Sequence, residues 1–481
     1  MLISPPDFAA RGVICGMTDL LEQLKEVTGA RGYLEGDSIG ERHFHDLMGA
    51  RRVRPQLLLR PATTAELSRI LALCHSADQP IAVQGGMTGL VSAAAPQQGE
   101  IAISLERMKQ VIEIDPFTST ITVEAGLPLQ TLQAAAADHG LLFPLDLGSR
   151  GSCTIGGNLS TNAGGNRVIR YGMTRDLVLG LEVVLADGTV LEGLSKLRKN
   201  NTGYDLKQLF IGSEGTLGVI TKAVLKLMPQ PGTQDVAVCG VNGFDKVADL
   251  LLHAQKILGG NLTGFEVIWR NTYELICQHA RVHASKVKVP LAADFDFYVL
   301  IESMGSGGDG DRSAFEDMLE AALDLTLVSD AVLSNSAAER EALWQVRDAA
   351  AGVAAGVGFM HNYDISLNVG DMGYFGIEVE KRLRDQWPDA ILGLFGHVGD
   401  GNLHIIIHVG EQTRALHKPI DDVIYGLIRE LGGSVSAEHG IGLMKKAYLG
   451  YSRSEAEITL MKTLKQALDP KGILNPGRIF D

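Results

Sequence analysis

The sequence predicts an α+β fold that is divided into two or three domains. Its 481 residues are too many for a single ordinary hydrophobic core. Glycine-rich runs gather within residues 84–218, whereas residues 233–427 alternate predicted strands and helices without such runs. This change in composition predicts at least two structural units of different kinds.

Composition describes a globular protein that does not bind nucleic acid. Hydrophobic residues make up 45% of the chain and charged residues 21%, which is typical of soluble domains. The net charge of −14 argues against non-specific binding to nucleic acid, because such binding needs clustered Lys and Arg. An anionic substrate would therefore need a local positive site, such as a metal ion or an arginine.

The cysteines and the first residues bear on the cellular compartment. Five scattered cysteines without a CxxC pair predict neither a disulfide framework nor an iron-sulfur cluster. Residues 1–16 have no basic start followed by an apolar run, so we expect an upstream extension of little structural importance. No apolar run is long enough to span a bilayer. We expect a cytoplasmic protein, or a protein of the mitochondrial matrix if the source is eukaryotic.

The first predicted elements lead to a glycine-rich loop. Residues 18–30 have apolar residues at helical spacing, and a short strand lies within 55–61. Thr and Glu at the start of residues 63–77 predict the beginning of a helix. A strand at 81–83 then opens onto residues 84–90, whose three glycines allow backbone N–H groups to converge on an anion.

Two further glycine-rich runs, at residues 144–149 and 154–166, strengthen this interpretation. So many glycines would be costly to order unless the backbone lay against a large polar ligand. The loop at 84–90 has neither the Walker closure nor the Rossmann spacing, yet a dinucleotide would meet the need.

Alternating strands are predicted between and after these runs, at residues 119–124 and 179–185. Asp187-Gly188 predicts a hairpin turn after the second strand. A last glycine-rich segment follows at 211–221, and residues 229–232 read as a linker.

Histidines gather in the second half of the chain. His397 and His404 flank residues 399–402, which are of turn-forming residue types. A turn there can fold the chain back and bring both imidazoles to one site. Residues 403–409 read as a buried strand with His404, Ile406 and His408 on one face.

Two imidazoles and a carboxylate suit zinc, manganese, cobalt or ferrous iron, with an open position for a substrate oxygen. We predict a divalent metal, zinc by first choice, held by His397, His404 and Glu438. His439 follows a predicted ligand directly and is the predicted general base, although Glu438 and His439 could exchange these roles.

Several of these motifs, in this order, resemble a known family over nearly the whole chain. The glycine-rich segments 85–90, 154–158 and 212–218 resemble the FAD domain of vanillyl-alcohol-oxidase type flavoproteins. Three later segments resemble the D-2-hydroxyacid dehydrogenase branch, which includes D-lactate and D-2-hydroxyglutarate dehydrogenases. These segments are 397–404, 438–440 and 468–476.

The resemblance implies a two-part FAD-binding domain, an inserted α+β cap domain and a C-terminal segment that returns to the FAD domain. The implied division is 1–228 for the FAD domain with its entry segment, 229–427 for the substrate or cap domain, and 428–481 for the returning segment. Some flavins of this superfamily are tethered to a loop histidine. Because no histidine lies between residues 76 and 138, we expect non-covalent FAD.

The residues expected to bind FAD lie in the glycine-rich runs and near the C-terminus. They are Gln84, Gly85, Gly86, Met87, Thr88, Gly89, Leu90, Pro144, Leu147, Gly148, Ser149, Thr154, Ile155, Gly156, Gly157, Ser160, Thr161, Asn162, Gly164, Gly165, Gly215, Gly218, Val219, Ile220 and Asn475.

The implied reaction is oxidation of a D-2-hydroxy acid to the 2-oxo acid. His439 would accept the hydroxyl proton while the flavin takes the hydride, and the metal would bind a carboxylate oxygen and the hydroxyl. Arg347 matches the family's carboxylate-binding arginine. A metal-free flavin oxidase and a flavin-binding regulator are the alternatives.

The far end of the substrate is where this sequence departs from its relatives. Hydroxyglutarate-type members carry a lysine where Asn362 stands, beside His361, and polar contacts where Ala351 and Ile406 stand. A second carboxylate would then lack its charge partner, unless His361 or a nearby arginine supplied it. The expected partners are a small 2-hydroxy acid and an electron acceptor (an electron-transfer flavoprotein, a quinone or a cytochrome), and a homodimer is allowed.

Overall fold

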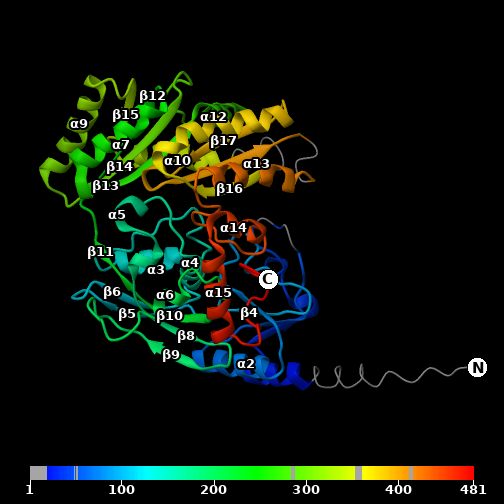
Figure 1. Cartoon of the computed structure of the whole chain (residues 1–481). Coiled ribbons are helices and arrows are strands. Elements are labelled where there is room, and N and C mark those ends of the chain that lie inside the picture. Colours follow the sequence, from blue (N-terminus) through cyan, green and yellow to red (C-terminus); the bar gives the residue numbers. More distant parts are fainter. Residues whose placement is uncertain (1–18, 48, 50–51, 283–287, 353–359, 411–414) are drawn as a thin grey trace, which may run out of the picture.

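The computed structural model describes the chain except for residues 1–18, 48, 50–51, 283–287, 353–359 and 411–414. The expected upstream extension over residues 1–16 lies outside the described residues. The α+β class is confirmed. Figure 1 shows two bodies, one above the other, with a seven-stranded sheet in the upper body and smaller sheets in the lower body. No helix in the described residues is long and apolar enough to cross a membrane.

The lower body contains a four-stranded and a five-stranded sheet. The four-stranded sheet has the order β1 (Tyr33–Glu35), β2 (Leu57–Leu59), β4 (Ile101–Ser104), β3 (Ile81–Gln84). The five-stranded sheet has the order β5 (Val111–Asp115), β6 (Thr120–Glu124), β10 (Val219–Lys226), β8 (Val178–Val184), β9 (Val190–Gly193). A small antiparallel pair joins β11 (Met228–Pro229) to β7 (Leu141–Leu142).

The lower body also contains the helices α2 (Thr64–Ser76), α3 (Leu129–Ala137), α4 (Ile155–Thr161), α5 (Val168–Tyr171), α6 (Lys207–Phe210), α14 (Leu449–Ser452) and α15 (Glu455–Leu468). Of these, α2 packs on β8 and α4 packs on β10. The predicted start of α2 is confirmed, because Thr63 caps the helix and accepts a hydrogen bond from the Glu66 N–H at 3.2 Å. The predicted hairpin at Asp187-Gly188 is also confirmed, since it joins β8 to β9.

Within one glycine-rich run, residues 155–161 form the short helix α4. Close packing explains why glycines occur in a helix. A Cβ atom added to Gly156 would lie 2.8 Å from the Cβ of Ala125, so only glycine lets α4 approach that strand end.

The seven-stranded sheet forms the upper body. Its order is β15 (Asp330–Leu333), β12 (Thr233–Val241), β14 (Phe297–Gly305), β13 (Leu262–Trp269), β17 (Ile391–Gly396), β18 (Asn402–His408), β16 (His361–Ser366). Its neighbouring strands pair antiparallel. The strand predicted over 403–409 is thereby confirmed as β18, and a single 3-10 turn over residues 398–400 folds the chain back before it.

Helices cover both faces of this sheet. Apolar side chains of α7 (Phe244–Leu258), α9 (Asp309–Asp324), α12 (Val369–Gln386) and α13 (His417–Glu430) pack on one face. Those of α8 (Arg270–Val282) and α10 (Ala337–Gly352) pack on the other face together with Phe395 and Ile406. We call this second side the α10 face.

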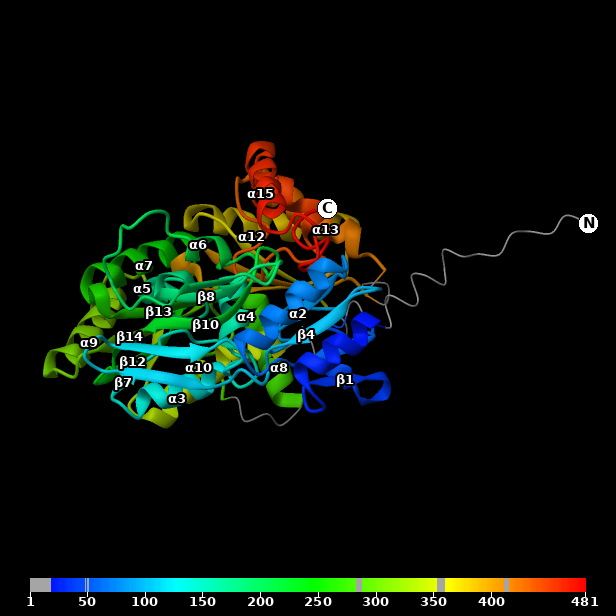
Figure 2. The ribbon, with the colours of Figure 1, turned by 90° about the horizontal axis from the view of Figure 1, so that it is seen from below.

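The end of the chain returns to the lower body. Leu474 forms a parallel bridge with Ile81 of β3, and the Asn475 N–H donates to the Ile81 carbonyl at 3.0 Å. Both views show the C-terminus beside α15 (Figure 1, Figure 2). These contacts support the proposed division of the chain, although the boundary at 427 falls inside α13, so the cap would end a few residues later.

Candidate active site

A cavity in the lower body lies among the predicted FAD-binding residues. Strand β3, helix α4, strand β10 and the loop at 214–218 contribute its walls. The predicted residues that line it are Gln84, Gly85, Thr154, Gly156, Gly157, Ser160, Thr161, Gly215, Gly218, Val219, Ile220 and Asn475.

The walls of this cavity fit a polar ligand that approaches the backbone closely. A Cβ atom added to Gly85 would lie 2.6 Å from Thr154 Oγ1, so a side chain there would fill the cradle. Thr154 Oγ1 is buried and has no hydrogen-bond partner among the described residues. A buried hydroxyl without a partner is costly, and a bound dinucleotide would satisfy it.

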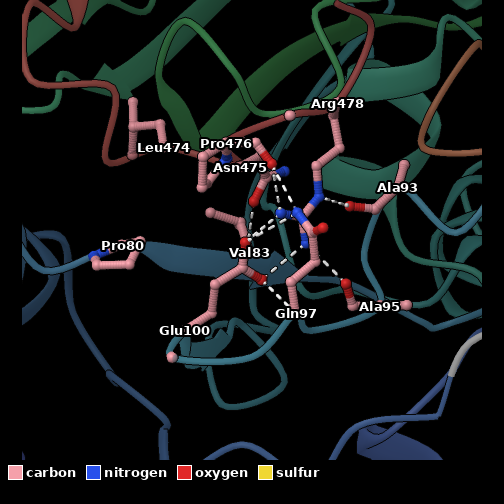
Figure 3. Close-up of polar contacts among 12 residues, drawn as sticks. Pro80, Val83, Ala93, Ala95, Gln97, Glu100, Leu474, Asn475, Pro476 and Arg478 are labelled. Carbon is pink, nitrogen blue, oxygen red and sulfur yellow. Dashed lines mark hydrogen bonds and ion pairs between the residues drawn. The ribbon is translucent and has the colours of Figure 1, made fainter. Parts of the chain in front are cut away.

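The C-terminal segment supports this cavity from outside (Figure 3). Asn475 Oδ1 accepts the Val83 N–H at 2.8 Å, and Asn475 Nδ2 donates to the Glu214 carbonyl at 2.7 Å. One side chain thus ties together the two chain segments that lead into the glycine-rich loops. Asn475 therefore lines the cavity and also holds these two segments in place.

Arg478 lies behind Asn475 and is almost fully buried, with 1% of its surface exposed. Its guanidinium binds both carboxylate oxygens of Glu100 and donates to the carbonyls of Ala93 (3.1 Å) and Ala95 (2.7 Å). Ala93 lines the cavity, so this ion pair fixes a wall of the expected cofactor site (Figure 3).

The other predicted FAD residues lie near the cavity without lining it. These are Gly86, Met87, Thr88, Gly89, Leu90, Pro144, Leu147, Gly148, Ser149, Ile155, Asn162, Gly164 and Gly165. The Ile155 side chain is 1% exposed and belongs to the hydrophobic core. Asn162 Oδ1 accepts the Arg175 N–H at 2.9 Å and so caps a neighbouring turn. Their contact with FAD stays a prediction.

A second polar site lies on the α10 face of the seven-stranded sheet, where three charged side chains meet. Glu266 of β13 accepts from Arg347 Nε at 2.8 Å through one oxygen and binds His397 Nδ1 at 2.6 Å through the other. Arg347 Nη2 lies 3.3 Å from His397 Nε2. Although burial opposes it, the charges of His397 and Arg347 lower the pKa of Glu266 to about 2.

The protonation of the histidines bears on metal binding. Burial disfavours the charged form of His397, but Glu266 raises the pKa of His397 to about 9. Burial and the charge of His397 hold the pKa of His404 well below its usual value. Because a metal ligand must be unprotonated, a metal bound by His397 would displace its proton.

The predicted metal ligands come together. His397, His404 and Glu438 each offer one donor atom, and these atoms lie within 4.8 Å of one another. Asp364, His404 and His439 form a second such group, whose donor atoms also lie within 4.8 Å of one another. The two groups share His404. Two imidazoles and a carboxylate form a donor set that fits zinc or a similar ion.

A buried amide beside these residues also indicates a ligand. Asn402 begins β18 and lies on the same face as His404, two residues along the strand. Its side chain is buried, and neither its nitrogen nor its oxygen has a hydrogen-bond partner among the described residues. A bound group at this site would satisfy it.

The second site contacts one of the predicted FAD loops of the lower body. Glu438 Oε1 accepts the N–H of Gly165, from the predicted FAD loops, at 2.6 Å. A Cβ atom added to Gly164 would lie 2.4 Å from the same oxygen. The predicted metal ligand Glu438 therefore meets the end of a glycine-rich loop of the lower body.

His439 lies next to this junction. Its ring is nearly parallel to that of His404, with 6.0 Å between the ring centroids. Burial lowers the pKa of His439, so the imidazole is neutral near pH 7 and able to accept a proton.

His361 lies on the opposite face of the sheet from Asn362, and its expected role in binding the substrate stays a prediction. Successive strand residues point to opposite faces, and Asn362 of β16 pairs with Ile406 on the α10 face. His361 is buried on the other face, with its ring 4.6 Å from that of His417. Asn362 stays a candidate, while the side chain of Ala351 lies outside the described residues.

Two site residues were missed from the sequence, Glu266 and Asp364. Glu266 is the one charged residue in the apolar strand Leu262–Trp269, a signal that could have revealed it. Asp364 lies in β16 and is fully buried, and it holds the loop that carries Glu438. Carboxylates in strands that are otherwise apolar are rarely buried without a specific partner.

Comparisons with known proteins agree with this arrangement. Residues 230–479 match the family model "FAD linked oxidases, C-terminal domain", and residues 55–193 match the model "FAD binding domain". The mitochondrial D-2-hydroxyglutarate dehydrogenase of Bos taurus is 42% identical over 427 residues, which cover 88% of this chain and 77% of the relative. A putative mitochondrial D-lactate dehydrogenase of Schizosaccharomyces pombe is 38% identical and covers 90% and 83%.

A solved structure shares the fold. The substrate-bound structure of p-cresol methylhydroxylase superposes with a TM-score of 0.75, covering 97% of both chains at 15% sequence identity. The family matches and the relatives support the same assignment. The chain therefore belongs to the FAD-linked oxidases of the vanillyl-alcohol-oxidase type, in the branch of the D-2-hydroxyglutarate and D-lactate dehydrogenases.

Proposed function

We propose that this protein is an FAD-dependent dehydrogenase that oxidises a D-2-hydroxy acid to the 2-oxo acid, with the help of a divalent metal. One observation carries the proposal. Arg347, the predicted metal ligands and His439 converge at the point where Glu438 contacts Gly165. A carboxylate anchor, a Lewis-acid site and a base thus adjoin the expected cofactor site.

The chain's own residues would bind and orient the substrate. Arg347 Nε donates to Glu266, and Arg347 Nη2 lies beside His397. Because a guanidinium has five N–H donors, others remain for a substrate carboxylate. His439 would accept the proton of the 2-hydroxyl. When bound, FAD supplies the hydride acceptor. A metal held by His397, His404 and Glu438 supplies Lewis acidity that lowers the pKa of the hydroxyl.

An anaerobic screen tests the function. Purified protein is mixed with a series of D-2-hydroxy acids and their L enantiomers, and bleaching of the flavin absorbance is followed. We expect reduction by at least one D acid and little by its enantiomer. If no D-2-hydroxy acid bleaches the flavin, the proposal is wrong.

Two alternatives have their own tests. A D-2-hydroxyglutarate dehydrogenase is favoured by the name of the bovine relative, and the relative rates with mono- and diacids decide. A metal-free flavin oxidase would hold no stoichiometric metal and would consume oxygen during turnover. Metal analysis and oxygen uptake on the same preparation separate it from the proposed dehydrogenase.

The compartment and the partners are also proposals. Both relatives carry the word mitochondrial in their names, which supports that location over the cytoplasmic one. The reduced flavin would pass its electrons to an acceptor such as an electron-transfer flavoprotein, a quinone or a cytochrome. A homodimer stays a prediction.

We predict that FAD is bound without a covalent bond. Acid or heat should release intact, yellow FAD into the supernatant, because Met87 and Thr88 stand in the loop where a tethering histidine would be expected. The supernatant is analysed by chromatography against authentic FAD. Flavin that stays with the precipitated chain would contradict this expectation.

We predict that neutral tails are preferred at the far end of the substrate. Asn362 and Ile406 lie opposite each other on the α10 face, and Ile406 is buried among apolar side chains. A distal carboxylate beside them would be costly to desolvate. D-Lactate or D-2-hydroxybutyrate should therefore have a higher kcat/KM than D-2-hydroxyglutarate.

The variant Asn362→Lys should shift this ratio toward the diacid by roughly 10- to 100-fold, the effect of a hydrogen bond to a charged group. Asn362→Met is the matched control, because it adds length without charge and should not favour the diacid. A wild type that prefers the diacid would mean that another cation serves the site. His361 does not lie on the required face.

A further inference from the structure

One buried carboxylate organises the loop that carries the predicted metal ligand Glu438 and the predicted base His439. Asp364 is fully buried in β16. Its Oδ2 atom accepts the backbone N–H groups of three successive residues, Ala437 at 3.1 Å, Glu438 at 2.9 Å and His439 at 2.9 Å. Three consecutive amides directed at one oxygen form an anion-binding turn, and here the anion is a side chain of the same protein.

The same carboxylate faces both imidazoles of the site. Asp364 Oδ1 lies 4.0 Å from His404 Nδ1, and Oδ2 lies 3.8 Å from His439 Nδ1. With Nδ1 of each ring toward Asp364, the Nε2 atoms are left for a metal or a substrate. Oδ1 has no hydrogen-bond partner among the described residues, so it could accept a hydrogen bond from His404 Nδ1 after a small movement of that ring.

Lys445 compensates the buried charge. Its Nζ atom lies 3.8 Å from Asp364 Oδ2 and donates to the carbonyls of Asp364 (3.1 Å) and Val435 (2.9 Å). The lysine thereby closes the loop from its other side. Asp364 belongs to the seven-stranded sheet, whereas residues 435–445 lead into the C-terminal segment, so the contact joins two parts of the chain at the site.

We propose that Asp364 is a positioning residue. It sets the loop that presents Glu438 and His439, and its charge faces the Nδ1 atoms of His404 and His439, without itself ligating the metal. Its Oδ2 accepts three backbone amides, whereas the Glu438 carboxylate accepts one, so the Asp364 carboxylate is the more firmly held within the protein. The inference rests on the proposed metal site, and it gives residue 364 a role different from that of a third ligand.

The first test needs no variant and no activity. Hydrogen exchange is measured on the metal-free, FAD-loaded protein for the amides of residues 437–439. We expect these amides to be strongly protected although they lie in a loop. Exchange at the rate of an open loop would overturn the proposal, and this result does not depend on whether the protein oxidises any hydroxy acid.

The second test compares Asp364→Asn with Asp421→Asn. Asp421 is also a buried carboxylate, and it binds the hydroxyl of Tyr363, the residue next to Asp364, on the opposite face of β16. Zinc affinity is measured by competition with a chromophoric chelator, and FAD content is measured on the same samples. A third variant, His404→Ala, reports the loss of a true ligand.

We expect Asp364→Asn to bind one zinc ion per chain with about 10- to 100-fold weaker affinity, the usual effect of losing an outer-shell partner. Exchange at residues 437–439 should become faster, while Asp421→Asn changes neither quantity. Wild-type affinity in Asp364→Asn would overturn the inference. Complete loss of zinc, as in His404→Ala, would also overturn it by making Asp364 a ligand. If Asp364→Asn does not fold, the wild-type exchange measurement still decides.

Discussion

Replacing His439 by Asn should slow reduction of the flavin by about 100- to 10,000-fold, the usual contribution of a general base. The rate is measured by anaerobic stopped flow with the best substrate of the screen. Asn keeps a polar side chain of similar size but cannot take up the substrate proton. FAD and metal contents should stay at wild-type levels, because His439 is not among the proposed ligands.

His253→Asn is the matched control for this prediction. His253 lies on α7, on the opposite face of the same sheet, and its Nε2 contacts the Met318 carbonyl at 3.1 Å. Its replacement should leave flavin reduction unchanged. If His439→Asn loses its metal, then His439 is a ligand and the roles of Glu438 and His439 are exchanged. Unchanged reduction with metal retained would remove His439 from the chemistry.

Replacing Arg478 by Met should destabilise the lower body by about 3–5 kcal/mol, because it leaves the carboxylate of Glu100 buried and unpaired. It also removes the donors that hold Ala93 and Ala95, so FAD should be retained poorly. Urea unfolding monitored by flavin fluorescence measures both effects. Most of the loss should appear in the transition that releases FAD.

Arg382→Met provides the comparison. Arg382 pairs with Glu378 and Glu430 at the surface of the upper body, where an ion pair contributes about 0.2–1 kcal/mol. The double variant Arg478→Met with Glu100→Gln should recover part of the lost stability, since the unpaired charge is gone. Equal unfolding midpoints for Arg478→Met and Arg382→Met would contradict the proposed anchoring role.

Local signals in the sequence predicted the elements that depend on a few neighbouring residues. The Thr63 cap and the turn between His397 and His404 both follow from residue types at short spacing, and both were confirmed. Two of the three predicted metal ligands lie seven positions apart, and the structure brings their donor atoms within 4.8 Å of each other and of a donor atom of Glu438. The resemblance of the glycine-rich segments to a flavoprotein family supplied the rest of the fold.

Features that depend on distant pairing were not predictable. Glu266 pairs with Arg347 and His397, which lie 81 and 131 residues away in the sequence. No local pattern can therefore predict its ion pairs. His361 and Asn362 exchange faces if the strand register moves by one residue, and the register is set by pairing with β18. Helix α4 depends on contact with Ala125, which permits glycines that local propensity would assign to a loop.

The bridge between Leu474 and Ile81 has a consequence for biosynthesis. All strands of the upper sheet lie between residues 233 and 408, so they can pair while the chain is still being synthesised. Strand β3, which leads into the first glycine-rich loop, gains its last neighbour only when residue 474 emerges from the ribosome. The cap should therefore be able to fold before residue 474 has been synthesised, whereas stable uptake of FAD should require that residue to have emerged.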